Sequence, residues 1–434
     1  MNFKNNLSKV FFGYGVCIFP LLLLVGPFVS EIYLISIIFF SIFYIIIKRK
    51  NYFFENKYIL FFVFFYLSTL FSTLLNFYNF DTSKSGIFFF RHILFALAIW
   101  YVLETYRVFE KKVVIFYSIF LLLISVDSLI QYYTGTNILG YKLLNTRVSS
   151  FFGDELILGG FIMRMIPIFL VFLLMSDNIK LNKINIFYTL IVSLSTLIVF
   201  LSGERTSFFL IILFFLSVFI ILKYLRKFIL FVMFFFILFS SIITTFQNYD
   251  QNNPSERMFL KTYRQILGDG DNRIEHKKKI FNKFYIFSHD HHGHYSLSFK
   301  IFKDHPIFGT GVKGFRYLCR NKLYILEKND GCSTHPHNTY VQILVSNGVI
   351  GFLLISTAFI FILREIIKSR NKLNSQKILN KNELSKVVIL LAIFINLWPI
   401  VPSGNFFNNW ISMYFFYPIG FYLFFEHLNE KKVN

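Results

Sequence analysis

The sequence predicts an all-α polytopic membrane protein with about 12 transmembrane helices and one large external loop of short helices. Of the 434 residues, 55% are hydrophobic and 62 are Phe. Several apolar runs exceed the roughly 18 residues that a helix needs to cross a bilayer. Basic residues lie mainly in the short connections between these runs, which is the pattern that membrane topology produces. The net charge of +21 therefore does not indicate nucleic-acid binding.

Twelve apolar runs define the expected spans. The first follows Lys4 and Lys9, but it lacks a cleavage site of the A-x-A type and is too long for a signal peptide, so we expect it to be an anchor. The twelve spans are expected at about 10–28, 30–47, 58–76, 86–103, 113–133, 156–175, 184–202, 206–222, 228–246, 339–363, 387–402 and 409–425.

The distribution of basic residues predicts the orientation. If the amino terminus is cytoplasmic, the inner connections are rich in Lys and Arg, and the basic segment 364–386 is a solvated cytoplasmic loop. The short outer connections then carry only Lys84, Lys142, Arg147 and Arg205. Both termini are expected in the cytoplasm. The chain divides into transmembrane helices 1–9 (1–246), the external loop domain (247–338) and transmembrane helices 10–12 with a cytoplasmic carboxyl terminus (339–434).

The external segment 247–338 holds eight of the ten histidines. Segments of this length are uncommon unless they form lids or binding surfaces, so we expect it to be functional. Short helices are expected at Met258–Leu267 and Ser296–Phe302, and the turn from His305 to Gly311 should end the second.

The cysteines divide between two environments. Cys17 lies in the first span and reads as a small packed residue. Cys319 and Cys332 share the external loop, where an oxidising compartment favours a disulfide over two unlinked thiols. On the chain-entropy account the bridge would stabilise the loop by about 3 kcal/mol. It would also restrain the approach to His335 and His337.

Two helix starts at the outer surface could bind an anion. The amino-terminal end of a helix offers free N–H groups and partial positive charge. Two inward-running helices should begin just after Ser202 and Asn338, both good N-cap residues. Arg205 then lies in one first turn and His337 just before the other. An arginine fork suits phosphate oxygens, and a neutral histidine can accept a proton from a hydroxyl.

Three motifs carry a family resemblance. They are Ser202-Gly203-Glu204-Arg205-Thr206, His337-Asn338 followed by Gly348 and Gly351, and Pro399 with the run from Ser403 to Asn409. Together they resemble the bacterial O-antigen ligase and O-antigen polymerase family. Its members are integral membrane glycosyltransferases, and the resemblance implies catalytic roles for His337 and Arg205. The ligase motif ends in Thr where this chain has Gly351, so both the polymerase and the ligase reading stay open.

The resemblance also implies a reaction. A glycan would pass from an undecaprenyl-diphosphate carrier to a saccharide acceptor, either the next lipid-linked repeat unit or lipid A-core, at the periplasmic face of the inner membrane. Direct displacement would invert the anomeric carbon, and the scheme needs no metal or other cofactor. Membrane lipid and a chain-length regulator or flippase are the implied partners. The substrate contacts that we expect are His335, Asn338, Arg147, Asp154, Arg164 and His294.

Each assignment has a simpler alternative. Arg205 could pair with Glu204 or with lipid headgroups, and His337 could only cap its helix. Asp154 could cap the sixth span, while Arg91 and Arg164 could be paired structurally within the membrane. His294, Arg273 and Arg316 are further candidates for contact with the diphosphate, and the sequence does not choose among them.

Two other classes of site or protein compete with this interpretation. The run from His289 to His294 suits zinc or copper, but adjacent histidines more often belong to a solvated loop, so no metal is expected. A transporter or flippase of lipid-linked sugars would use intramembrane charge and broken helices, for which Arg91, Arg164 and Pro167 give weak support. A structural scaffold would leave Arg205 and His337 without a purpose.

Overall fold

The computed structural model describes residues 7–144, 146–176, 185–245, 254–260, 262–264, 287–324, 331–376 and 379–431. Within these ranges the regular elements are helices. Two isolated β-bridges, Thr136 with Lys142 and Leu144 with Arg147, lie in the connection between Thr134 and Ser150. The described elements before the external loop are η1 (Lys9–Tyr14), α2 (Gly15–Val25), α3 (Pro27–Ile47), η2 (Asn51–Phe53), α4 (Lys57–Leu75), α5 (Phe80–Ile87), α6 (Phe90–Tyr106), α7 (Lys111–Thr134), η3 (Ser150–Phe152), α8 (Leu158–Met175), α9 (Ile186–Leu201), α10 (Arg205–Ile221), η4 (Lys223–Leu225) and α11 (Arg226–Thr245). The described elements that follow α11 are η5 (Glu256–Leu260), α13 (His289–Asp304), α14 (Gly314–Leu318), α15 (Thr339–Ser375), α16 (Lys381–Asn396) and α17 (Asn409–Glu430).

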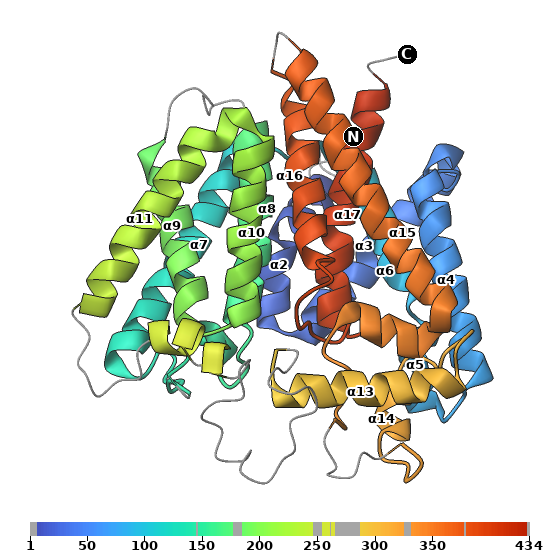
Figure 1. Ribbon diagram of the computed structural model, residues 1–434. Coiled ribbons are helices and arrows are strands. Elements are labelled where there is room, and N and C mark those ends of the chain that lie inside the picture. The colour runs from blue at the N-terminus through green and yellow to red at the C-terminus, as the bar shows by residue number, and fades with distance from the viewer. Residues whose placement is uncertain are drawn as a thin grey trace.

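The long helices run side by side as a bundle (Figure 1). Seven of the described helical segments are long and apolar enough to cross a membrane, and three more are apolar but shorter. Together with α16 and α17, they fall on the twelve runs expected from the sequence. Among the described residues an all-helical architecture with seven helices suited to cross a membrane is therefore confirmed, while about twelve crossings and an external loop stay predictions.

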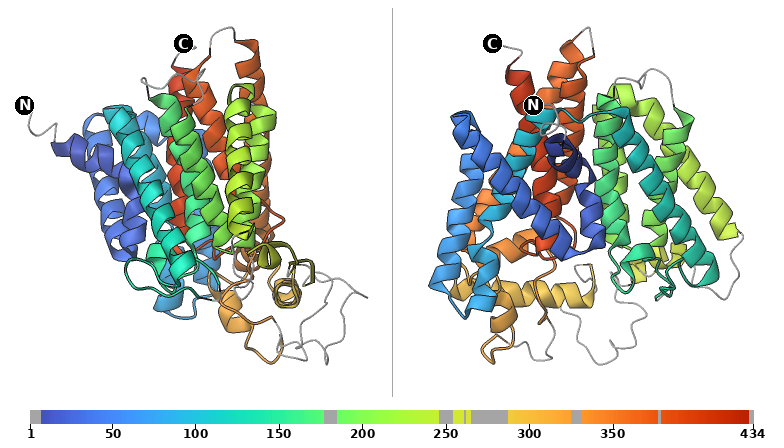
Figure 2. Two further views of the ribbon diagram at one scale, coloured as in Figure 1. Left: turned by 90° about the vertical axis from the view of Figure 1, so that its left-hand side faces the viewer. Right: turned by 180° about the vertical axis from the view of Figure 1, so that it is seen from behind.

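Burial separates the central helices from the peripheral ones. Helices α8 and α17 are covered on nearly every face, whereas α4 and α11 expose rows of Phe, Leu and Ile. A helix whose outer face is apolar is suited to contact lipid tails rather than water. The two classes therefore place α8, α16 and α17 in the middle of the bundle, as Figure 2 shows from two further sides.

Helix α13 lies across one end of the bundle, together with α14 and α5, whereas α17 ends at the opposite side (Figures 1 and 2). It is longer than the expected helix at Ser296–Phe302 because Ser288 caps it, accepting a hydrogen bond from the backbone N–H of His291. The histidine run therefore forms helical turns with His292 buried, which corrects the expectation of a solvated loop. Of the helix expected at Met258–Leu267, residues 265–267 lie outside the described residues.

Helix α15 is kinked at Gly348, which departs from the expectation of one continuous apolar helix. Gly348 has φ 66° and ψ −164°, far from helical values. The turn that follows α13 packs against the break, where the backbone N–H groups of Thr310 and Gly311 donate to the carbonyls of Val345 and Ser346, both at 2.9 Å. The turn thus satisfies carbonyls that the kink removes from the helical ladder.

The bundle end opposite α13 contains buried charge. Lys386 is 4% exposed, and its Nζ lies 2.7 Å from Glu426, 3.3 Å from Glu383 and 3.9 Å from Glu365. Three helices, α15, α16 and α17, are joined by these contacts. The segment 364–386, expected to be a solvated loop, is thus largely helical and partly buried, because apolar periodicity does not reveal ion pairs between helices.

Candidate functional site

The start of α15 is fixed by Asn338. Its side-chain oxygen accepts hydrogen bonds from the backbone N–H groups of Tyr340 and Val341, as an N-cap does. Its amide nitrogen donates to the carbonyls of Pro399 and Val401, at 2.8 and 3.1 Å. Asn338 is therefore the expected N-cap and also ties α15 to the segment before α17. Its role as a substrate contact stays a prediction.

His337 directly precedes this cap in a left-handed conformation, with φ 57°. Its carbonyl accepts a hydrogen bond from the backbone N–H of Ser403 at 2.8 Å. Left-handed backbone is uncommon for residues other than glycine, so surrounding structure must hold it. The Asn338 cap and the Ser403 contact supply that restraint.

Three histidines gather around this residue. The ring centroid of His337 lies 4.0 Å from that of His335, 5.1 Å from that of His294 and 5.9 Å from that of His291. His294 and His291 come from α13, whereas His335 and His337 come from the loop before α15. The structure thus brings together three histidines that the sequence singled out, and adds His291. Among the described residues, no group of three or more His, Cys, Asp or Glu has the arrangement of a metal site.

Burial keeps the central imidazoles neutral. Burial, together with the neighbouring His335, His294 and His291, lowers the pKa of His337 to about 3. Burial also lowers the pKa of His335 to about 4, while a backbone contact with Ser403 acts in the opposite direction. Near neutral pH both rings therefore carry a lone pair that can accept a proton. A bound anion would raise these pKa values, because opposite charge favours the protonated form.

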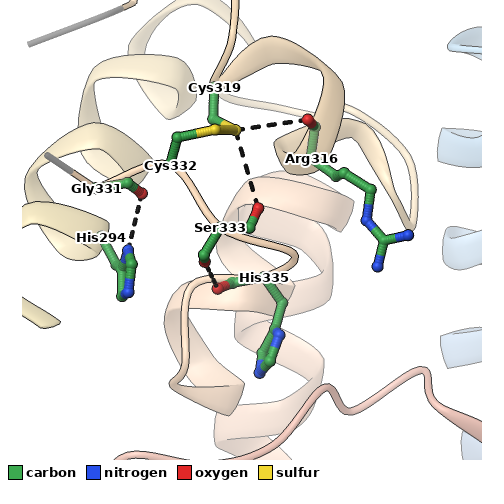
Figure 3. The surroundings of a disulfide bond; sticks show 7 residues. All are labelled: His294, Arg316, Cys319, Gly331, Cys332, Ser333 and His335. Atoms are coloured by element: carbon green, nitrogen blue, oxygen red, sulfur yellow. Dashed lines mark hydrogen bonds between the residues drawn. A yellow bond between two sulfur atoms is a disulfide. The ribbon is translucent and has the colours of Figure 1, made fainter. Parts of the chain in front are cut away.

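A disulfide holds the loop that carries two of these histidines (Figure 3). Cys319, just after α14, is bonded to Cys332, with the Cα atoms 5.1 Å apart. The neighbouring Gly331 accepts a hydrogen bond from Nδ1 of His294 at 2.8 Å. On the other side, Ser333 donates from its hydroxyl to the carbonyl of His335 at 2.5 Å. The disulfide therefore restrains the partner of the His294 ring and the partner of the His335 backbone.

Arginines gather beside the start of α10. Arg205 is the first residue of this helix, and its Nε donates to the carbonyl of Arg257 at 3.1 Å. Arg147 donates from its Nε to the carbonyl of Ser202 at 2.9 Å. The charge of Arg205 also lowers the pKa of His291, although burial is the larger cause. The arginines and the histidines lie at the same end of the bundle (Figure 1).

The caps at this end differ from the expected ones. Ser202 ends α9 instead of capping α10, because the chain needs Gly203 and Glu204 to turn between the two helices. Glu204 accepts hydrogen bonds from the N–H groups of Gly159 and Gly160, at 2.6 and 3.0 Å, and so caps α8. Asp154 is exposed and does not cap this helix. Burial raises the pKa of Glu204 despite these bonds.

The other expected basic residues lie around this centre. Arg164 donates to the side chain of Asn396 at 2.8 Å and to the carbonyl of Gly160 at 2.7 Å, as expected for a structurally paired residue. Arg91 is paired with Glu31 at 3.1 Å. The charge of Arg316, in α14, contributes to the lowered pKa of His335. Arg273 lies outside the described residues. Substrate contact by Arg164, Arg147, Asp154 and His294 stays a prediction.

Two members of the site were missed by sequence reasoning. The sequence suggests His291 only as a metal ligand, yet its place one helical turn from His294 puts both residues on one face of α13. No sequence motif marks Arg257 as a member of the site. Its position beside Arg205 depends on how the segment after α11 folds back, which no local pattern reveals.

Comparison with known proteins agrees with this picture. Residues 190–356 match the family model described as O-Antigen ligase. The match includes Arg205, Arg257, His294 and His337 and supports the O-antigen ligase and polymerase family, which confirms the resemblance carried by the sequence motifs. Among curated proteins, none matches the chain.

Proposed function

Because the O-antigen ligase match covers the segment that builds the site, we propose that this protein is a membrane glycosyltransferase. It moves a glycan from an undecaprenyl-diphosphate carrier to a saccharide acceptor, which is the next lipid-linked repeat unit or lipid A-core. One observation carries the proposal: four histidines, including His337, gather before the start of α15, at the same end of the bundle as the arginines around the start of α10 (Figure 1). A cation for the leaving group and a base for the acceptor therefore lie at the same end of the bundle.

Arg205 binds the donor's diphosphate in this scheme. Arg205 lies in the first turn of α10, where the free N–H groups of the helix and the guanidinium can both donate hydrogen bonds to an anion. Negative charge grows on the diphosphate as the bond from its oxygen to the anomeric carbon breaks. Preorganised cations lower the free energy of that transition state. The proposal uses no metal, since the guanidinium group supplies the positive charge.

His337 acts as the general base. Its neutral imidazole accepts the proton of the acceptor hydroxyl while the oxygen attacks the anomeric carbon. The diphosphate leaves from the opposite face with the bonding electron pair, so the configuration at this carbon inverts. A base with a pKa of about 3 holds a proton poorly, but the charge of the bound diphosphate raises that pKa. Donor binding thus prepares the base for its step.

The proposed topology puts the site at the periplasmic face of the inner membrane, with both termini in the cytoplasm. The asymmetry of Lys and Arg between the two sets of connections supports this orientation. A reporter active only in the cytoplasm, fused at Asn321, should be silent, and activity there would overturn the orientation. Arg91 and Arg164 are the charged residues that would support a transporter. In the bundle Arg91 pairs with Glu31 and Arg164 donates to Asn396, so both have structural partners.

Substitution in a purified system tests the chemistry. The assay follows product size with a lipid-diphosphate glycan and an acceptor in chelator. His337→Ala and Arg205→Ala should each lower transfer by about 100-fold or more. Arg205→Lys should remain well below wild type, because lysine lacks the planar fork. Suitable controls are His305→Ala and Arg320→Lys. Full transfer by His337→Ala would refute the base, and activity that vanishes in chelator would refute the metal-free scheme.

A further inference from the structure

We propose that Arg257 is a further diphosphate-binding residue, held with Arg147 and Arg205 around Gly203. These three arginines form what we call the arginine cradle. The inference rests on the proposed function, because the diphosphate that it binds is that of the glycan donor. It adds a contribution from η5, a segment to which neither the motifs nor the family match assigns a role.

The three side chains are fixed in the same way. Each uses its Nε atom to donate to a backbone carbonyl: Arg147 to Ser202 at 2.9 Å, Arg205 to Arg257 at 3.1 Å and Arg257 to Gly203 at 3.3 Å. A guanidinium is planar, so a bond at Nε restrains the direction of its terminal nitrogens. The contacts of Arg205 and Arg257 also link α10 to η5. A fixed fork loses less entropy when it binds an anion than a mobile one does.

Gly203 is the seat of the cradle. It has φ 66°, a backbone conformation that disfavours a side chain. A Cβ atom added there would lie 2.7 Å from Nε of Arg257 and 3.0 Å from Cγ of Arg147. The close approach of both arginines therefore requires glycine between them. This gives a structural reason for Gly203 that does not depend on the family motif.

Charge indicates the class of ligand. The cradle contributes three positive charges; burial lowers the pKa of Arg205, and the charge of Arg257 lowers it further. The carboxylate of Glu204 is already used by the start of α8 and by the hydroxyl of Ser207 at 2.9 Å. Burial lowers the pKa of Arg147, and the charges of Arg257 and Arg205 lower it further. A diphosphate diester carries two negative charges and would relieve this repulsion, whereas a monophosphate diester carries one.

The position of the cradle fits the reaction. Arg205 begins α10 at the end of the bundle where α13 and the start of α15 also lie (Figure 1), and the base His337 directly precedes the cap of α15. A diphosphate in the cradle would therefore lie at the same end of the bundle as the histidines. Arg257 lies on the side of Gly203 from which η5 approaches, so it would contact the diphosphate from a segment separate from α10.

Binding to the purified full-length protein tests this inference without requiring transfer. The probes are undecaprenyl diphosphate, undecaprenyl monophosphate and inorganic diphosphate. Arg257→Gln should weaken undecaprenyl diphosphate binding about 10-fold or more and raise the donor KM to match, with the acceptor KM unchanged. Its effect on the monophosphate should be several-fold smaller. Arg257→Lys should recover only part of the loss, and Gly203→Ala should act in the same direction.

The controls separate the alternative outcomes. Arg264→Gln changes an exposed arginine of the same short segment and should leave all three affinities unchanged. Unfolding midpoints of every variant are measured, so that a folding defect is recognised. Unchanged diphosphate affinity in Arg257→Gln would overturn the inference, and so would equal losses for monophosphate and diphosphate, which indicate a general headgroup contact. Equal losses for inorganic and lipid-linked diphosphate would support direct contact with the phosphates. A wild-type protein that binds diphosphate through Arg257 but transfers no glycan would refute the proposed function alone.

Discussion

Replacing Gly348 with alanine should uncouple α15 from the external turn. The added Cβ would lie 2.1 Å from the carbonyl oxygen of Ile307 and 2.7 Å from the backbone nitrogen of Phe308. Both are backbone atoms, so no side-chain rotation can relieve the overlap. The turn would have to move away from the kink or the kink would have to straighten.

The expected cost follows from the geometry. A non-glycine residue in this backbone region is strained by about 1–3 kcal/mol. Moving the turn also weakens the bonds from Val349 N–H to the Pro306 carbonyl and from Thr310 N–H to the Val345 carbonyl, both made across the kink. Each such bond contributes about 1 kcal/mol, so the total should be about 3–5 kcal/mol.

Thermal unfolding in detergent, followed by circular dichroism, measures this loss, and the transfer assay reports on the site. We expect Gly348→Ala to unfold several degrees below wild type and to lose most of its transfer, since His337 lies at the start of the same helix. Gly404→Ala is the matched control, because its Cβ would meet only Ile411, at 3.3 Å or more. The reasoning fails if Gly348→Ala equals wild type in both measurements, or if the control loses as much.

Three further outcomes follow from the structure. The folded-state pKa of His337, about 3, lies below the ordinary 6.5, so its contribution to stability is present above pH 6.5 and is lost as the pH falls towards 3. We therefore expect a plot of kcat/KM against pH to show no acid limb with a midpoint near 6.5. An acid limb at that pH that His337→Gln abolishes would contradict the burial of this ring. Changing Cys319 and Cys332 to serine should destabilise the loop by about 3 kcal/mol, seen as faster amide exchange around Gly331, and unchanged exchange would show that the bridge restrains little. Lys386→Met should destabilise by about 3–5 kcal/mol because it strands buried carboxylates, whereas Lys368→Met, at a side chain 66% exposed, should change little; equal unfolding midpoints would show that the buried ions are not energetically coupled.

Local patterns predicted the features that depend on local physics. Apolar length located the helices, and residue type identified Asn338 as a cap, because burial of a span and capping of a helix start are decided within a few residues. The same reasoning misplaced the start of α10. Ser202 is a good cap by type, yet the turn at Gly203 moves the helix start to Arg205.

The features that were missed depend on contacts between distant segments. The kink at Gly348 occurs because the turn after α13 supplies replacement hydrogen bonds, and glycine alone does not indicate that partner. Arg257 reaches Gly203 only after the chain folds back, so its sequence neighbours carry no sign of it. Lys386 lies in a charge-rich stretch of sequence that is typical of a loop, but its carboxylate partners come from three helices.

The turn after α13 is bonded to α4 as well as to α15. Ser72 donates its hydroxyl to the carbonyl of Ser346 at 2.5 Å and accepts the N–H of Gly311 at 3.0 Å, while Asn76 donates to the carbonyl of Gly309 at 3.1 Å. The turn after α13 and helix α4 are therefore joined by hydrogen bonds next to the kink in α15. Suppose that only this loop is exchanged with that of a relative, in order to transfer its sugar preference. The new turn would then pack against Ser72 and Asn76 of α4, side chains that it does not match. A working chimera must carry the two matching side chains of α4 together with the loop.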